Sequence, residues 1–236
     1  MAAQQRAKDD FNDVDTYGAR AALRVDLNDN WTITPQVMGQ KTEANGAFWY
    51  DAGLGDLQIA RFYPDETEDK WMQGALTIEG RIGNFDLIYA GAYLKRDDTV
   101  DADYSDYTFW YDDCCSYVSA YWGDSAGNPL PDPSQYINGK DGYKRQSHEL
   151  RISSPTDKRL RFVGGLFYQD SEHEIFQNYQ IKGLGGFIYE GEFLTIVDPN
   201  WPNTIWLTNQ LRKDKEKAVF GELSFDFTEQ LTATVG

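Results

Sequence analysis

The chain has 236 residues, of which 41% are hydrophobic and 15% aromatic, and its formal net charge at pH 7 is −16. This acidic excess argues against a nucleic-acid partner, because phosphates require a basic surface. The mean hydropathy of −0.62 argues against a helical membrane protein, since no window approaches the roughly 18–20 uninterrupted apolar residues of a spanning helix. These values do not exclude a β-barrel, in which only alternate strand residues face lipid.

The first predicted element is a hairpin with strands at 17–27 and 31–41. Apolar residues occupy alternate positions from Ala19 to Leu27, and the second strand continues the pattern. A hairpin with one apolar and one polar face requires an apolar medium on one side and water on the other. The same alternation predicts further strands at 71–82, 85–96, 146–154, 159–171, 217–227 and 230–236.

The connections between these strands alternate in length. Short turns are predicted at 28–30, 83–84, 155–158 and 228–230. Long connections are predicted at 42–70, 97–145 and 172–216. Long structureless loops are unusual in a compact soluble domain, whereas outer-membrane barrels combine short periplasmic turns with long extracellular loops. The sequence thus predicts an all-β fold: a segment of an antiparallel transmembrane β-barrel, with about eight meandering strands, that belongs to a larger barrel.

Aromatic residues are predicted to gather at both ends of the strands, as the two interfaces of a bilayer require. Trp31, Phe85 and Phe227 lie near short turns, and the strand ends toward the long connections carry Tyr17, Tyr93 and Tyr168. The apolar faces are therefore expected to meet outer-membrane lipid. The charged residues on the opposite faces are expected to line a wet lumen: Arg24, Asp26, Glu79, Arg81, Glu149 and Arg151.

Three stretches of the sequence resemble barrel segments of TonB-dependent outer-membrane receptors. They are DVDTYGARAALRVDLNDNWTITPQV, SHELRISSPTDKRLRFVGGLFYQDSEHE and AVFGELSFDFTEQLTATVG. The resemblance implies that residues 1–236 are part of a receptor barrel domain, in a Gram-negative outer membrane, without its plug domain and C-terminal strands. It also implies active import of a scarce ligand, such as a siderophore, cobalamin, haem or a saccharide. Energy would come from the TonB complex through an N-terminal region outside this chain.

Two of the long connections carry candidate ligand-binding residues, because aromatic side chains stack on sugar rings and on flat parts of chelators. The first group is Phe48, Trp49 and Tyr50, with Arg61 as a possible anion partner. The second group is Tyr104, Tyr107, Trp110, Tyr111 and Trp122. The alternative is that each loop packs its aromatic residues on itself.

No metal centre is predicted. Asp101, Asp103 and Asp106 could supply oxygen ligands to Ca²⁺, but Asp106 stands where an EF-hand loop requires glycine. A solvated acidic loop is therefore the preferred interpretation. The adjacent cysteines at 114–115 are either two thiols or a vicinal disulfide, since zinc requires more ligands at wider spacing.

No enzymatic activity and no cofactor are expected. The only histidines, His148 and His173, fall in separate predicted segments, and no nucleophile or paired carboxylate belongs to a convergent group. The alternative to a transporter is a secreted soluble β-sandwich that binds carbohydrate, in which the apolar faces pack against each other.

Overall fold

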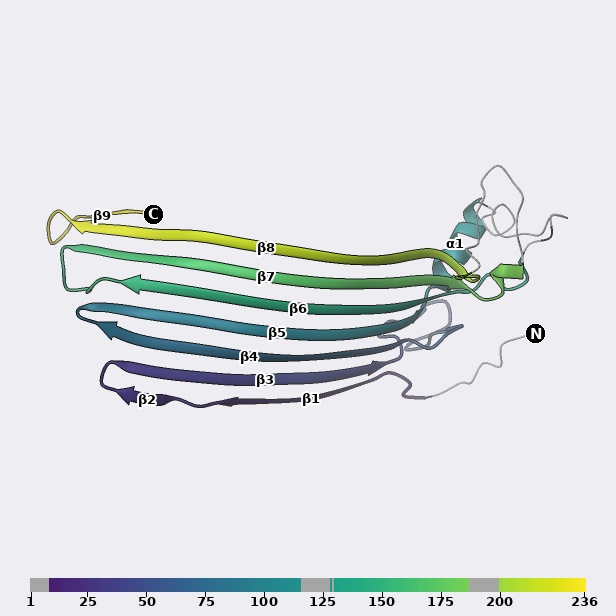
Figure 1. Cartoon of the computed structure of the whole chain (residues 1–236). Coiled ribbons are helices and arrows are strands. Elements are labelled where there is room, and N and C mark those ends of the chain that lie inside the picture. Colours follow the sequence, from purple (N-terminus) through teal and green to yellow (C-terminus); the bar gives the residue numbers. More distant parts are fainter. Residues whose placement is uncertain (1–8, 116–127, 129, 187–199) are drawn as a thin grey trace.

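The computed structural model describes residues 9–115, 128, 130–186 and 200–236. Nearly all of its regular structure lies in one antiparallel sheet (Figure 1). The strands are β1 (Asp13–Ala22), β2 (Val25–Asn28), β3 (Trp31–Asn45), β4 (Glu66–Ile82), β5 (Phe85–Asp103), β6 (Gln135–Ser153), β7 (Leu160–Ile181), β8 (Thr204–Asp226) and β9 (Thr232–Val235). The helices are α1 (Ser105–Cys115) and the short 3-10 helix η1 (Leu184–Gly186).

The strands follow one another in chain order across the sheet. The order is β1-β3-β4-β5-β6-β7-β8-β9, and β2 also pairs with β3. The prediction of an antiparallel all-β meander is therefore confirmed. The break between β1 and β2 lies opposite Pro35, whose carbonyl accepts a hydrogen bond from the Leu23 N–H at 3.0 Å. Because proline has no N–H to return, the ladder is interrupted at this point.

The predicted long connections were too long. β5 continues to Asp103 and β6 begins at Gln135. β7 continues to Ile181 and β8 begins at Thr204. The connections between regular strands are therefore 46–65, 104–134 and 182–203. Several of the extra strand residues are apolar, such as Ile175, Phe176 and Leu207, but they do not alternate strictly with polar residues. The pattern therefore does not mark them as strands, although their backbones continue the ladder with the neighbouring strands.

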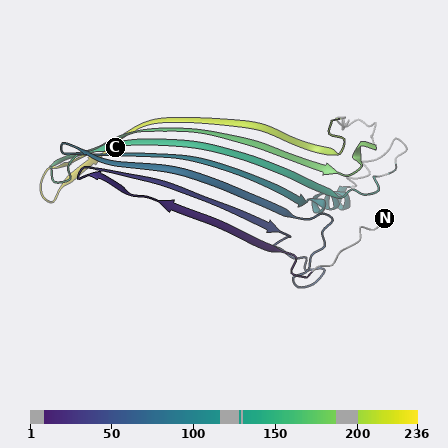
Figure 2. The ribbon, with the colours of Figure 1, turned by 60° about the horizontal axis from the view of Figure 1, so that its bottom comes forward.

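The sheet is a single layer, with the short turns at one end and α1 and the long connections at the other (Figures 1 and 2). The buried apolar residues of the described chain lie in or next to the long connections: Ala47, Leu130, Ile181 and Leu184. Large apolar side chains along the strands are exposed, for example Val219 at 83% and Val235 at 66%. The described residues contain no second sheet that would cover them, as a β-sandwich requires.

Candidate functional site

The strand register sorts the side chains into two faces, because residues directly opposite each other in an antiparallel ladder point to the same side. One row of register partners crosses six strands: Ile33, Ile78, Tyr89, Leu150, Leu166 and Val219. We call the side that carries this row the apolar face. The next row belongs to the opposite face and begins with Thr34, Thr77, Ala90 and Glu149.

The residues predicted to line a lumen lie together on the opposite face. Asp26 is the register partner of Thr32, which is the partner of Glu79, and Arg24 bonds Asp26 at 3.1 Å. The remaining members fall on the same side in β4 and β6: Arg81, Glu149 and Arg151. Their common placement is an observation, and a lumen on that side stays a prediction.

The apolar face ends obliquely in a border of lysines. In β3 and β4 the border lies at Lys41 and Lys70, which are register partners. Followed from partner to partner across the sheet, the row that contains Lys70 reaches Leu211 in β8. In β8, however, the lysine that borders the apolar band is Lys217, six positions closer to the short turns than Leu211. Across five strand spacings of about 24 Å, the border therefore shifts by about 20 Å, which corresponds to a strand tilt of about 40°. Strands in barrels tilt by about 35–45°.

The short-turn end shifts in the same sense. The row of register partners that contains Asp86, at the start of β5, reaches Glu222 in β8. β8 continues for four residues beyond Glu222 toward the short turns. In β4 the apolar side chains run from Met72 to Ile82, which is about 33 Å along the strand. At a tilt of about 40° this corresponds to a height of about 25 Å, the height of the apolar band of outer-membrane barrels.

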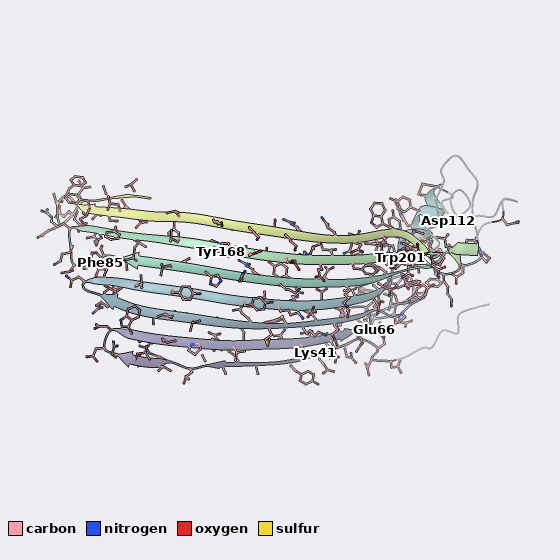
Figure 3. The ribbon with its side chains drawn as sticks, viewed as in Figure 1. Lys41, Glu66, Phe85, Asp112, Tyr168 and Trp201 are labelled. Atoms are coloured by element: carbon pink, nitrogen blue, oxygen red, sulfur yellow. A yellow bond between two sulfur atoms is a disulfide. The ribbon has the colours of Figure 1, made fainter. Side chains whose placement is uncertain are left out.

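The aromatic residues lie at the edges of this band. The strand extensions place Tyr93 and Tyr168 within β5 and β7, not at strand ends as predicted, and Figure 3 shows Tyr168 midway along the sheet and Phe85 at the short-turn end. Both tyrosines still lie on the apolar face, immediately before its charged residues: Lys95 follows Tyr93, and Asp170 follows Tyr168, at alternate positions. The two tyrosines therefore mark the edge of the apolar band and not the ends of the strands.

Lysine and arginine are sorted between the two faces. Every lysine in the described strands lies on the apolar face, and every strand arginine lies on the opposite face. The lysines, which we call the lysine belt, are Lys41, Lys70, Lys95, Lys140, Lys144, Lys213, Lys215 and Lys217. The arginines are Arg20, Arg81, Arg96, Arg145, Arg151, Arg161 and Arg212.

At the long-connection end, Arg61 joins the loop 46–65 to the start of α1. Its guanidinium donates to the Asp65 carboxylate at 2.9 and 3.0 Å, to the Asp103 carbonyl at 2.7 Å and to the Asp106 carboxylate at 3.2 Å. Burial lowers the pKa of Arg61, but these acidic neighbours raise it by more, so the pKa lies above its usual value. Four of the five guanidinium N–H donors are therefore engaged within the protein, and a role of Arg61 as an anion partner stays a prediction.

The three aspartates considered for Ca²⁺ all have partners within the protein. The Asp103 carboxylate, 2% exposed, accepts the N–H groups of Phe62, Tyr63 and Ser105. Asp106 bonds Arg61, and Asp101 bonds the Asn138 amide. Within the described residues no group of three or more His, Cys, Asp or Glu side chains is arranged to hold a metal ion.

The second aromatic group is brought together by α1, which the sequence did not predict. Tyr104 contacts Tyr107 with ring centroids 5.3 Å apart, and Tyr111 contacts both Tyr107 and Trp110 at 4.7 Å. Tyr179 of β7, not a predicted site residue, extends the group with an edge contact to Tyr104 at 5.3 Å. Trp122, also predicted, lies outside the described residues.

The first aromatic group is exposed and more scattered. Phe48, Trp49 and Tyr50 are 58%, 57% and 52% exposed. The Trp49 ring lies 5.1 Å from the Arg61 guanidinium, a cation–π contact that ties it to the loop. At the end of α1, Cys114 and Cys115 are joined by a disulfide, which decides between the two states left open by the sequence.

Comparison with protein-family models and with curated proteins gives no match. Among solved structures, this chain is similar to a chain of the FpvAI–pyocin S2 complex. The TM-score is 0.50, and the identity is 13% over 92% of this chain and 28% of the other chain. The fold is that of a β-barrel sheet.

The chain is also similar to the ferric yersiniabactin uptake receptor FyuA from Yersinia pestis, with a TM-score of 0.48 and 11% identity over 92% of this chain and 26% of that one. This chain therefore spans 26–28% of the length of these two receptor chains. In its described residues no helix is long and apolar enough to cross a membrane.

Proposed function

We propose that the chain forms part of the wall of an active transporter in a Gram-negative outer membrane, with its apolar face against lipid. The oblique apolar band carries this proposal. Its height of about 25 Å and its tilt of about 40° are those required of strands that cross a bilayer within a barrel. A water-facing sheet has no physical reason to keep its apolar residues in a band of constant height while the register shifts from strand to strand.

The opposite face then lines the interior of the barrel. Arg81, Arg96 and Arg161 on this face pair with carboxylates of neighbouring strands, and Arg96 bonds Asp69 twice, at 2.8 and 3.1 Å. Such a surface is wet and polar, which suits the passage of a hydrophilic ligand beside a plug supplied by residues outside this chain. TonB acts as the energy-coupling partner through that same part of the protein.

The long-connection end captures the ligand. The aromatic rings at the start of α1, with Tyr179 beside them, offer flat surfaces for stacking, and Trp110 is 64% exposed. Flat, partly polar molecules such as iron chelates or saccharides are the class that such a surface binds. The nearby loop 46–65 adds Phe48, Trp49 and Tyr50 to the same end of the sheet.

A pair of neighbouring substitutions tests the lipid-facing assignment. Val37 lies on the apolar face of β3, within the band, and Gln36 lies on the opposite face. An arginine at the bilayer midplane on the lipid side costs about 2–4 kcal/mol. Val37 is the register partner of Gly74, between the middle of the band and its lysine border. Val37→Arg should therefore lower the free energy of folding into lipid vesicles by about 1–3 kcal/mol, and Gln36→Arg by much less. Equal losses in the two variants, measured by urea titration in vesicles, contradict the proposal.

A further inference from the structure

The sorting of lysine and arginine has a physical cause beyond charge, since both side chains are cationic. Lysine carries a compact ammonium on a long flexible stem, which can lie along an apolar surface while the charge reaches a polar layer. Arginine carries a rigid fork that suits carboxylates on the same wet surface. Lysines confined to the apolar face therefore point to a polar layer that begins at the edge of the apolar band.

The lysine belt differs from the rest of this acidic chain. It follows the oblique upper border of the band from Lys41 in β3 to Lys217 in β8, and Figure 3 shows Lys41 near the long-connection end of its strand. Several belt lysines pair with carboxylates, such as Lys41 with Glu43 at 2.6 Å. An ammonium has three donors, so these pairs position the charge without using all of its hydrogen bonds.

The belt is densest in β8. Lys213, Lys215 and Lys217 occupy alternate positions of one strand on the apolar face, about 6.8 Å apart. Lys213 bonds Glu172 at 2.9 Å and Lys215 bonds Asp170 at 3.3 Å.

Lys217 is the exception within this group. It is exposed and has no ion-pair or hydrogen-bond partner among the described residues. Its neighbours on the apolar face are Tyr168, its register partner, and Val219, which is 83% exposed. The three N–H donors of this ammonium, beside an aromatic ring and an apolar band, are free to bind an anionic partner.

We propose that Lys213, Lys215 and Lys217 form a binding site for the phosphate of an anionic lipid headgroup, with Lys217 as the member next to the apolar band. The proposal rests on the lipid-facing assignment made above. The lipid is favoured over free phosphate because the same face continues, on the short-turn side of Lys217, into Val219 and Leu223, which would contact the acyl chains. Asp170 and Glu172 position the ammonium groups of Lys215 and Lys213 beside Lys217.

The test uses the purified protein in neutral detergent micelles, with its thermal unfolding followed as lipid is added. Phosphatidylglycerol should raise the unfolding temperature of the wild type, and phosphatidylcholine or inorganic phosphate should not. Each lysine removed should weaken the apparent affinity for phosphatidylglycerol about fivefold, which corresponds to one cationic side chain at an anionic membrane surface. The variants are Lys217→Gln alone and the triple variant with Lys213→Gln and Lys215→Gln.

Two control variants test whether the effect depends on the position of the lysines or on their charge. Arg212→Gln removes a cation from the opposite face of the same strand and should leave the response to lipid unchanged. Replacement of all three lysines by arginine keeps the charge and should keep most of the response. High salt should weaken the wild-type response, because the lysines are exposed.

Equal responses of the wild type and the triple glutamine variant overturn the proposal, and so does stabilisation by inorganic phosphate alone. Insertion of both proteins into phosphatidylcholine vesicles is measured in parallel. If neither inserts, the lipid-facing assignment itself fails. If both insert and neither distinguishes phosphatidylglycerol, only the headgroup site fails.

Discussion

Arg61 connects three segments that are distant in sequence. Its side chain is 12% exposed and contacts Asp65 in its own loop, Asp103 at the end of β5 and Asp106 in α1. The pair with Asp65 is partly buried and bidentate, whereas Asp106 is 83% exposed, so that its contribution is small. Arg61 therefore holds the loop 46–65 against the helix that carries the second aromatic group.

Replacement of Arg61 by methionine tests this role. It leaves the carboxylates of Asp65 and Asp103 without their cation in a partly buried site, which should lower the local opening free energy by roughly 3 kcal/mol. Amide hydrogen exchange should become faster across 46–65 and the first turn of α1, but not in β4 or β5. Arg20→Met, on the opposite face of β1, should leave this exchange unchanged. Unaltered exchange in the Arg61 variant would show that the cluster does not hold the loop.

The sequence alone indicates which aromatic residues lie in the long connections, but not which residues they and Arg61 contact. Phe48, Trp49 and Tyr50 stand out by composition alone. The sequence does not show the ion pairs of Arg61, because its acidic neighbours lie as many as 45 positions away. Tyr179 was missed for the same reason, since only the register of β7 brings it to Tyr104. Contacts between loops depend on the length of the strands that carry them, which composition does not encode.

At the scale of elements, two glycines of β4 differ in what a side chain would meet. A Cβ on Gly80 would lie 2.3 Å from the Trp31 ring, which crosses the strand at this point. A Cβ on Gly74, also on the apolar face, would meet nothing within 4 Å. The absence of a side chain at Gly80 therefore seats the tryptophan at the edge of the apolar band, beside the first short turn.

Valine substitutions at the two positions should have different effects. Gly80→Val forces Trp31 from its place and should cost about 1–3 kcal/mol, as overpacking does elsewhere. Gly74→Val gains β-propensity at an open position and should be neutral or slightly stabilising. Unfolding in vesicles and the emission wavelength of tryptophan report on both variants. A Gly80 variant as stable as the Gly74 variant would contradict the proposed seating of Trp31.

The elements themselves were predictable where one face is apolar. The hairpins at 17–41 and 217–236 follow from strict alternation and from short polar turns. The strand ends were not predictable, because residues such as those from Asp97 to Asp103 are mainly acidic or polar and carry only a weak apolar signal, at Val100 and Ala102. The helix α1 was missed because its sequence, SDYTFWYDDCC, has no apolar stripe of helical period.

At the scale of the whole molecule, the two faces require different surroundings. The opposite face carries the strand arginines and their acidic partners, and the apolar face carries a band about 25 Å high between two aromatic edges. A sheet of this kind has no partner for its apolar face in water, where such an exposed patch leads to association. We therefore expect lipid to cover one face of the sheet and water the other.

The most direct measurement is a scan of single nitroxide labels along β4 from Lys70 to Ile82, in vesicles, with Cys114 and Cys115 replaced by serine. Collision rates with oxygen, which dissolves in lipid, should alternate with a period of two residues. They should be high at the even positions of the apolar face, such as Leu76 and Ile78, and low at the odd positions. The alternation should fade at Lys70. Rates that show no period of two, or that are highest at the odd positions, would contradict the claim that the apolar face contacts lipid.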